Sequence, residues 1–150
     1  MRNESAHGLL MAHLIQRVED FLEAHPIGRC FVNTGCKLPN GHLVHPDVAV
    51  LLNENVGKAG ALIEGAPDWV CEILDEDDNP FAVSNLLQQY RQAGVREMWL
   101  VSLSRRAVWV GYLHETGWEA LPRHGGRIES HVLRGFYVEI DKLFAEPQTV

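Results

Sequence analysis

Apolar residues recur at the spacing of an α-helix in two stretches of the chain. The first set is Leu10, Leu14, Val18, Phe21 and Leu22, and the second set is Val83, Leu86, Leu87 and Tyr90. We expect the first set to form one face of a helix over residues 5–24, with Pro26 just beyond its end. The second set predicts a helix over residues 80–93, which Gly94 ends.

Short apolar runs bounded by turn residues predict strands on both sides of the second helix. These runs are residues 29–34, 42–52 and 68–74 before the helix, and residues 97–103 and 107–113 after it. Asn40-Gly41 predicts a hairpin turn between the first two runs, because both residues tolerate a positive φ. Residues 117–131 indicate short strands around a Gly-Gly turn, and residues 132–144 indicate a strand or irregular segment that closes with a helical turn.

This order of helices and strands predicts one α/β (α+β) domain over residues 1–150, built on a mixed sheet. The 150 residues are enough to enclose a core, and the apolar content of 46% is ordinary for a globular protein. Residues 53–66 are polar and contain glycine and alanine, so we expect a loop there.

The strand predicted over residues 68–74 has one acid, Glu72, among apolar residues. Alternation of side chains places Trp69, Cys71 and Ile73 on one face and Val70, Glu72 and Leu74 on the other. A carboxylate in apolar surroundings is costly to bury without a partner, so Glu72 is expected to be ion-paired, protonated or bound to a cation.

Asp47 is the candidate partner of Glu72, because it follows Pro46 and opens the apolar run V-A-V-L-L. If the two strands are neighbours, both acids reach the same side of the sheet. Paired carboxylates are ligands for Mg²⁺ or Mn²⁺, with waters and substrate phosphate completing the shell. The alternative is that Asp47 caps a turn and Glu72 pairs with a nearby Arg or Lys, since structural ion pairs also place acids in sheets.

A second group of possible metal ligands is Cys30, Cys36, His42 and His45. Their number suggests zinc, but the spacings C-x5-C and H-x2-H match no common zinc knuckle. Cys30 and Cys36 have the same parity in the predicted hairpin, so a shared face is expected. The alternative interpretation makes Cys30 a core residue and the histidines surface residues.

The formal net charge of −7 excludes a general attraction to nucleic acid or to an anionic membrane. Chemistry on nucleic acid would therefore need a local basic patch or a metal ion. The longest apolar runs are far shorter than the roughly 20 residues of a membrane span, so no membrane is expected as a partner. Three cysteines without a spaced framework, and an N-terminus without an apolar signal region, predict a cytoplasmic protein.

Several short motifs occur in an order and spacing that resemble one known family. They are His7-Gly8, H-P-D-V-A-V at 45–50, P-D-W-V-C-E-I-L at 67–74, Tyr90 with A-G-V at 93–95, E-M-W-L-V at 97–101 and L-R-G-F at 133–136. With these motifs, nearly the whole chain resembles the Uma-two family of bacterial candidate endonucleases. That family lies within the restriction endonuclease-like PD-(D/E)XK superfamily.

The resemblance implies a restriction endonuclease-like fold, in which helices flank a central mixed β-sheet and extra strands follow at the C-terminal end. It implies a metal-dependent endonuclease that hydrolyses phosphodiester bonds in DNA. It also implies that Asp47 and Glu72 are catalytic residues and bind Mg²⁺ or Mn²⁺. In active members a lysine completes this site, where it activates the attacking water and stabilises charge at the phosphate.

The chain departs from the family at the residues that complete this site. The superfamily motif places lysine where this chain has Leu74, and the family places lysine and aspartate at the positions of Leu86 and Ala82. Gln89 could orient a water but adds no charge, and Lys58 could substitute only if the fold brings it near. Two alternatives to an active endonuclease therefore stay open, an inactive nuclease-fold homodimer with a binding or regulatory role and a small zinc-binding domain.

Overall fold

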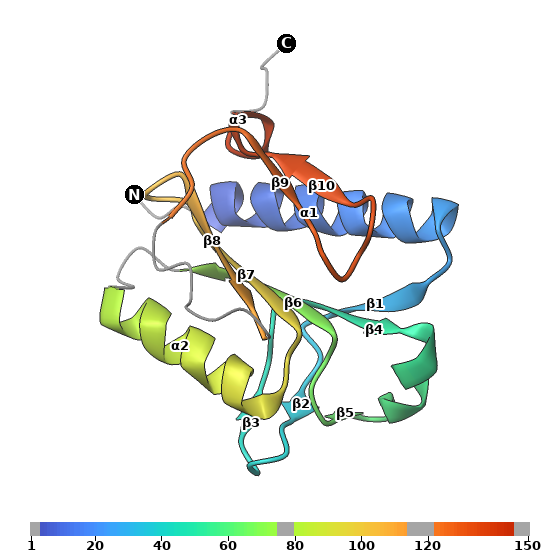
Figure 1. Cartoon of the computed structure of the whole chain (residues 1–150). Helices are drawn as coiled ribbons and strands as arrows, with labels where there is room; N and C mark the ends of the chain where they lie inside the picture. Colours follow the sequence, from blue (N-terminus) through green and yellow to red (C-terminus); the bar gives the residue numbers. More distant parts are fainter. Residues whose placement is uncertain (1–3, 75–79, 114–121, 146–150) are drawn as a thin grey trace.

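A five-stranded mixed sheet forms the centre of the computed structural model, which describes residues 4–74, 80–113 and 122–145 (Figure 1). Across the sheet its strands are β1 (Gly28–Val32), β4 (Val48–Leu52), β6 (Trp69–Leu74), β7 (Glu97–Ser102) and β8 (Ala107–Tyr112). Neighbouring strands run antiparallel, except that β6 and β7 are parallel. The parallel pair is joined by a helix, as parallel strands require a long crossover.

Two helices cover opposite faces of this sheet, as Figure 1 shows. One face carries α1 (Glu4–Ala24) together with the pair β9 (Arg127–Glu129) and β10 (Tyr137–Glu139) and the short helix α3 (Ile140–Leu143). The other face carries α2 (Pro80–Ala93) and a small sheet of β2 (Cys36–Lys37), β3 (Leu43–Val44) and β5 (Ile63–Glu64). A 3-10 helix, η1 (Asn53–Lys58), follows β4.

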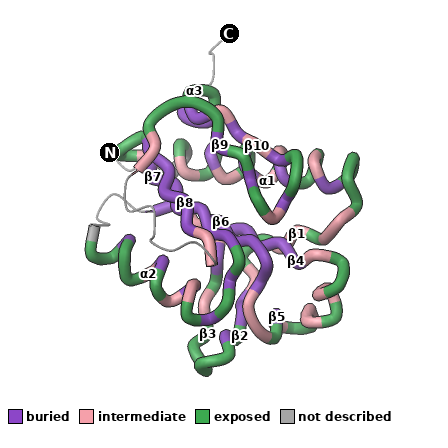
Figure 2. Tube along the Cα trace, viewed as in Figure 1, coloured by how far each residue is buried: buried purple, intermediate pink, exposed green. Residues whose placement is uncertain are grey.

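Alternating residues of the strands enter two separate cores. Trp69, Cys71 and Ile73 of β6 belong to the core under α1, whereas Val70 and Leu74 belong to the core under α2. This separation confirms the predicted alternation of β6. The central strands are buried almost throughout, and exposed residues concentrate on the outer helices and turns (Figure 2).

Both long helices agree with the sequence prediction. The predicted range 80–93 is the observed range of α2, and α1 spans 21 residues as far as Ala24. Gly94 has a φ of 93°, which glycine adopts without strain, and Val95 N–H then donates to the Tyr90 carbonyl at 3.0 Å. The apolar face of α2 is buried, except that Leu86 is half-buried.

The two runs of the predicted hairpin, residues 29–34 and 42–52, do pair antiparallel, as β1 with β4, but the turn at Asn40-Gly41 does not join these two strands directly. β1 ends at Val32, and Asn33 with a φ of 50° turns the chain out of the main sheet. Residues 42–52 form two strands, β3 and β4, because Pro46 lies between them and has no N–H for a sheet hydrogen bond. The turn at Asn40-Gly41 does form, but it joins β2 to β3, while β1 pairs with β4.

The later strand predictions agree where the structure describes them. β7 and β8 lie within the predicted runs, and β9 falls in the range 117–131, of which residues 117–121 lie outside the described part. The segment from residue 132 onward contains β10 and closes with the helical turn α3. The predicted loop over residues 53–66 contains η1 and β5.

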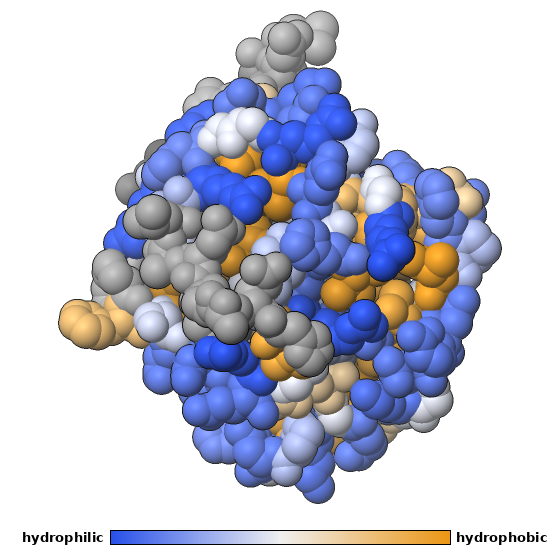
Figure 3. All heavy atoms as spheres, in the orientation of Figure 1, coloured by the Kyte–Doolittle hydropathy of each residue, from blue (hydrophilic) through white to orange (hydrophobic). Residues whose placement is uncertain are grey.

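The surface is largely hydrophilic on the face shown in Figure 3, with apolar side chains visible between the polar ones. In the part of the chain that the structure describes, no helix combines the length and the apolar character needed to cross a membrane.

Candidate functional site

Asp47 and Glu72 lie on neighbouring strands of the central sheet. Val48 of β4 pairs with Cys71 of β6, so the two acids are the next residues along this antiparallel ladder. The Ile73 N–H donates to Asp47 Oδ2 at 2.7 Å, which ties the Asp47 carboxylate to the backbone beside Glu72. The condition set by the sequence, that the two acid-bearing strands are neighbours, is therefore met.

Tyr90 of α2 holds the Glu72 carboxylate. Its hydroxyl donates to Glu72 Oε1 at 2.9 Å, and the tyrosine is fully buried whereas Glu72 is half-buried. Burial raises the pKa of Tyr90, and the charge of Glu72 raises it further, with a smaller contribution from Asp47. The tyrosine therefore stays protonated and acts as a permanent donor to the carboxylate.

Two cysteines adjoin the acid pair but remain thiols at neutral pH. Burial raises the pKa of Cys36 to about 11, with a further contribution from Glu72. Burial also raises the pKa of Cys71, and both Asp47 and Glu72 add to that shift. In the metal-free protein the ionised groups that the acid pair presents are therefore its carboxylate oxygens.

Oxygen ligands of this kind fit a hard divalent cation. Mg²⁺ is held in proteins by one or two carboxylates, with waters and phosphate oxygens in the remaining positions. Among the residues that the structure describes, no three His, Cys, Asp or Glu side chains gather into a larger ligand set. The pair Asp47 and Glu72 therefore suits Mg²⁺ or Mn²⁺ better than a four-ligand zinc site.

No lysine takes the place that the resemblance implies. Leu74 is buried in the core under α2, and Leu86 packs against the same core. Lys58 donates from Nζ to the Ala66 carbonyl at 3.4 Å, and within the described residues it forms no ion pair with either acid. Gln89 is half-buried, and it has no hydrogen bond with the acids in the described part of the chain.

The four residues of the zinc interpretation are not brought together. Cys30 packs against the core under α1 and Cys36 lies in the core under α2, so the predicted shared face is wrong. The physical reason is the turn at Asn33, which sends the chain from the main sheet to the small sheet between the two cysteines. Burial, followed by the nearby Glu19, raises the pKa of Cys30 to about 12.

Glu97 is a second acid in an apolar strand, and its role was not recognised from the sequence. It is fully buried and accepts four hydrogen bonds, from Trp99 Nε1 at 2.7 Å, Ser130 Oγ at 3.1 Å, and the N–H groups of His131 and Val132 at 2.8 Å each. These donors satisfy the carboxylate and fasten β7 to the turn before β10. Glu97 is therefore a structural residue.

Tyr90 was likewise expected only as a core residue. The available signal was its position on the apolar face of the second helix, eighteen residues after Glu72. That face had to pack on the sheet, and a tyrosine there carries a hydroxyl that needs a partner when buried. The spacing could not show which strand residue would accept the hydrogen bond.

Comparison with known proteins matches residues 1–141 to the family model Uma2, described as "Putative restriction endonuclease". A crystal structure of "a putative nuclease belonging to DUF820" from Anabaena variabilis ATCC 29413 is similar with a TM-score of 0.79 and 19% identity, over 92% of this chain and 79% of that chain. A cryo-EM structure of a DrdV–DNA complex matches with a TM-score of 0.39 and 11% identity, over 90% of this chain and 12% of that chain. No curated protein matches the chain. The similarity to the Anabaena structure confirms the predicted fold, a central mixed sheet flanked by helices.

Proposed function

The chain belongs to the Uma2 family, and from this premise we propose that it is a metal-dependent endonuclease that hydrolyses phosphodiester bonds in DNA. The observation that carries the proposal is the hydrogen bond from Ile73 N–H to Asp47 Oδ2, which ties the Asp47 carboxylate to the backbone of β6 next to Glu72. In the proposed site Asp47 and Glu72 hold Mg²⁺ or Mn²⁺. The bound ion would polarise the phosphate and lower the pKa of a coordinated water.

The chain's own residues orient the proposed ligands. The Ile73 N–H fixes one oxygen of Asp47, and the Tyr90 O–H fixes one oxygen of Glu72. An ionised carboxylate has about four lone-pair sites, so a carboxylate that accepts such a hydrogen bond can also bind a metal ion. Gln89, the residue before Tyr90, is proposed to orient the attacking water, although it offers no charge to the transition state.

Metal binding is tested first by thermal unfolding with Mg²⁺ or Mn²⁺. At a metal concentration about a hundred times Kd, we expect the melting temperature to rise by roughly 5 °C. Asp47→Ala should abolish the rise, because it removes one of two carboxylate ligands. Glu23→Ala, at an exposed acid of α1, is the matched control and should keep the full rise. If no divalent ion raises the melting temperature of the parent protein, the proposal of a metal site is wrong.

Catalysis is tested with plasmid DNA, single-stranded DNA and RNA in the presence of Mn²⁺. The parent protein should cleave DNA, and Glu72→Ala should remove the cleavage. Activity that survives this substitution unchanged comes from a contaminant and contradicts the proposal.

An inactive nuclease-fold protein, acting as a homodimer in binding or regulation, is the second candidate. It is favoured by one observation, the leucines packed in the core under α2 at the two positions where the resemblance implies lysine, Leu74 for the superfamily motif and Leu86 for the family. Leu86 lies one turn before Tyr90 on the same helix face, so Leu86→Lys places an ammonium group near the acids. Size-exclusion chromatography measures whether the parent protein is a dimer. A parent dimer that does not cleave DNA, together with cleavage by Leu86→Lys, would establish the second candidate.

A further inference from the structure

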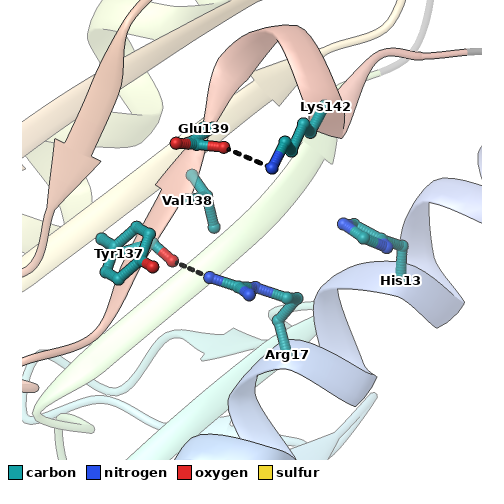
Figure 4. Close-up of a pocket in the computed structure, with 6 residues that line it drawn as sticks. All are labelled: His13, Arg17, Tyr137, Val138, Glu139 and Lys142. Atoms are coloured by element: carbon teal, nitrogen blue, oxygen red, sulfur yellow. Dashed lines mark hydrogen bonds and ion pairs between the residues drawn. The ribbon is translucent and has the colours of Figure 1, made fainter.

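A small pocket lies between α1 and the segment from β10 to α3. Its volume is about 110 Å³, and it is lined by His13, Arg17, Tyr137, Val138, Glu139 and Lys142 (Figure 4). The elements that form it cover the core under α1, whereas Glu72 contacts Tyr90 in the core under α2. The pocket is therefore on the opposite face of the sheet from the acid pair, and the proposed nuclease chemistry does not use it.

Arg17 brings a positive charge to this pocket, and among the described residues it is paired with no acid. The guanidinium donates to the main-chain carbonyl of Tyr137 and lies 5.3 Å from the centre of the Tyr137 ring. Within the described residues Arg17 forms no ion pair with a carboxylate. Half-buried charges are usually paired, and a guanidinium has five N–H donors, of which a carbonyl uses few.

The one acid of the pocket is already shared between two cations. Glu139 accepts from Lys142 Nζ at 2.9 Å and from Arg127 Nη2 at 3.5 Å. The pKa of Glu139 is lowered mainly by Lys142 and further by Arg127. Arg127 and Lys142 thus share the Glu139 carboxylate, and Arg17 adds a further positive charge to the pocket lining, in a chain whose net charge is −7.

His13 adds a neutral ring beside Arg17. Burial lowers the pKa of His13, and the charge of Arg17 lowers it further, so the imidazole is uncharged at neutral pH. In Figure 4 the His13 and Arg17 side chains extend from α1 toward the segment that carries Glu139 and Lys142. Donors therefore approach the pocket from two sides.

We propose that this pocket binds a phosphate group, with Arg17 and Lys142 providing the positive charge and His13 a ring nitrogen. A volume of about 110 Å³ is well above the roughly 10–15 Å³ that a single water needs in a cavity, so it accommodates one tetrahedral oxyanion. A guanidinium matches two phosphate oxygens at once, and a dianion gains more from several cations than a carboxylate does. The phosphate belongs either to a small free molecule or to the end or backbone of a nucleic acid.

The test is a titration of the full chain with inorganic phosphate. Binding is measured by calorimetry and by the change in the NMR signals of the His13 ring. Sodium chloride at the same ionic strength is the control for screening. Phosphate should bind and move the His13 signals, whereas chloride should do neither. Arg17→Gln should weaken phosphate binding about tenfold, since it removes a charged hydrogen-bond donor. Arg134→Gln, at an exposed arginine outside the pocket, should leave binding unchanged.

A second variant keeps the proposal testable if Arg17→Gln disturbs the fold. Lys142 is 81% exposed, so Lys142→Gln should fold normally and weaken phosphate binding severalfold. The proposal is overturned if phosphate binds no better than chloride, or if Lys142→Gln and a folded Arg17→Gln both bind phosphate as tightly as the parent. Asp47→Ala should keep phosphate binding, so a failure of the nuclease proposal does not decide this one.

The source of the phosphate is read from short oligonucleotides with a 5′-phosphate or a 5′-hydroxyl end. If only the 5′-phosphorylated oligonucleotide binds, and Arg17→Gln weakens that binding, the ligand is a terminal phosphate. Equal binding of both forms through Arg17 identifies a backbone phosphate, and binding of inorganic phosphate alone identifies a small molecule. Each of these results supports the pocket as a phosphate site.

Discussion

Glu72 and Glu97 stand on neighbouring parallel strands, yet their surroundings differ completely. Glu97 is fully buried and accepts four hydrogen bonds, three of them from the turn at residues 130–132. Glu72 is half-buried, accepts the Tyr90 hydroxyl and lies beside a second carboxylate, Asp47. The comparison teaches that an acid in an apolar strand becomes structural when neutral donors surround it.

A pair of acids poses a different physical problem from a single acid. Four donors satisfy the oxygens of Glu97, which forms no ion pair among the described residues. Two adjacent carboxylates repel each other, and a divalent cation is the partner that relieves both charges at once. The surroundings of Glu72 therefore favour a functional role, and those of Glu97 favour a role in stability.

The largest expected effect is a difference in protein stability between the Glu97→Ala and Glu72→Ala variants. Glu97→Ala leaves four donors without their acceptor, two of them in buried and two in part-buried hydrogen bonds, so the free energy of unfolding should fall by about 3 kcal/mol or more. Glu72→Ala in metal-free buffer should change it by less than about 1 kcal/mol, because the lost Tyr90 hydrogen bond is offset by relief of repulsion with Asp47. Urea denaturation of both variants measures the difference.

Glu97→Gln is the control for the shape of the side chain. It keeps one acceptor oxygen but turns an amide toward the Trp99 N–H, so an intermediate loss of about 1–2 kcal/mol is expected. If Glu72→Ala destabilises the protein as much as Glu97→Ala does, Glu72 is structural and the proposed metal site loses its basis.

A medium effect is expected from Tyr90→Phe, which removes the hydroxyl that orients Glu72. The free energy of unfolding should fall by about 1 kcal/mol, and the affinity for Mg²⁺ or Mn²⁺ should fall about tenfold, as for other groups that orient a ligand. Isothermal titration with the metal measures the affinity. Tyr137→Phe is the control, and an equal loss of affinity there would contradict the orienting role of Tyr90.

The smallest effect concerns alkaline pH. Because the native pKa of Cys36 is raised from 9.0 to about 11, the unfolded chain loses this proton first, and stability falls as pH rises from 9 toward 11. Glu72→Gln removes one cause of the raised pKa of Cys36. The variant should therefore lose less stability than the parent between pH 8 and pH 10, by on the order of 0.5 kcal/mol after solvent screening.

Urea denaturation at the two pH values measures this difference. Glu23→Gln, at an exposed acid on α1, should lose as much stability as the parent. An unchanged pH dependence in Glu72→Gln would show that the charge of Glu72 does not reach the thiol.

Much of the fold could be predicted because the signals are local. The periodicity of apolar residues is set within one element, so it identified both long helices and the two faces of β6. Pairing between strands is decided by contacts between distant residues. The predicted antiparallel pairing of residues 29–34 with 42–52 is present as β1 with β4, but the small-sheet strands β2 and β3 lie between them along the chain, and the turn at Asn33 separates Cys30 from Cys36.

The sequence by itself showed that Glu72 and Asp47 needed an explanation, because they stand beside apolar runs and in the motifs that carry the family resemblance. Only the tertiary structure decided how the acids are held. Tyr90 reaches Glu72 across eighteen residues, and three of the four donors of Glu97 come from residues 33 to 35 positions away. Hydrogen-bond partners so far apart in sequence come together only when the sheet and its covering layers pack. Local sequence patterns therefore do not predict these pairs.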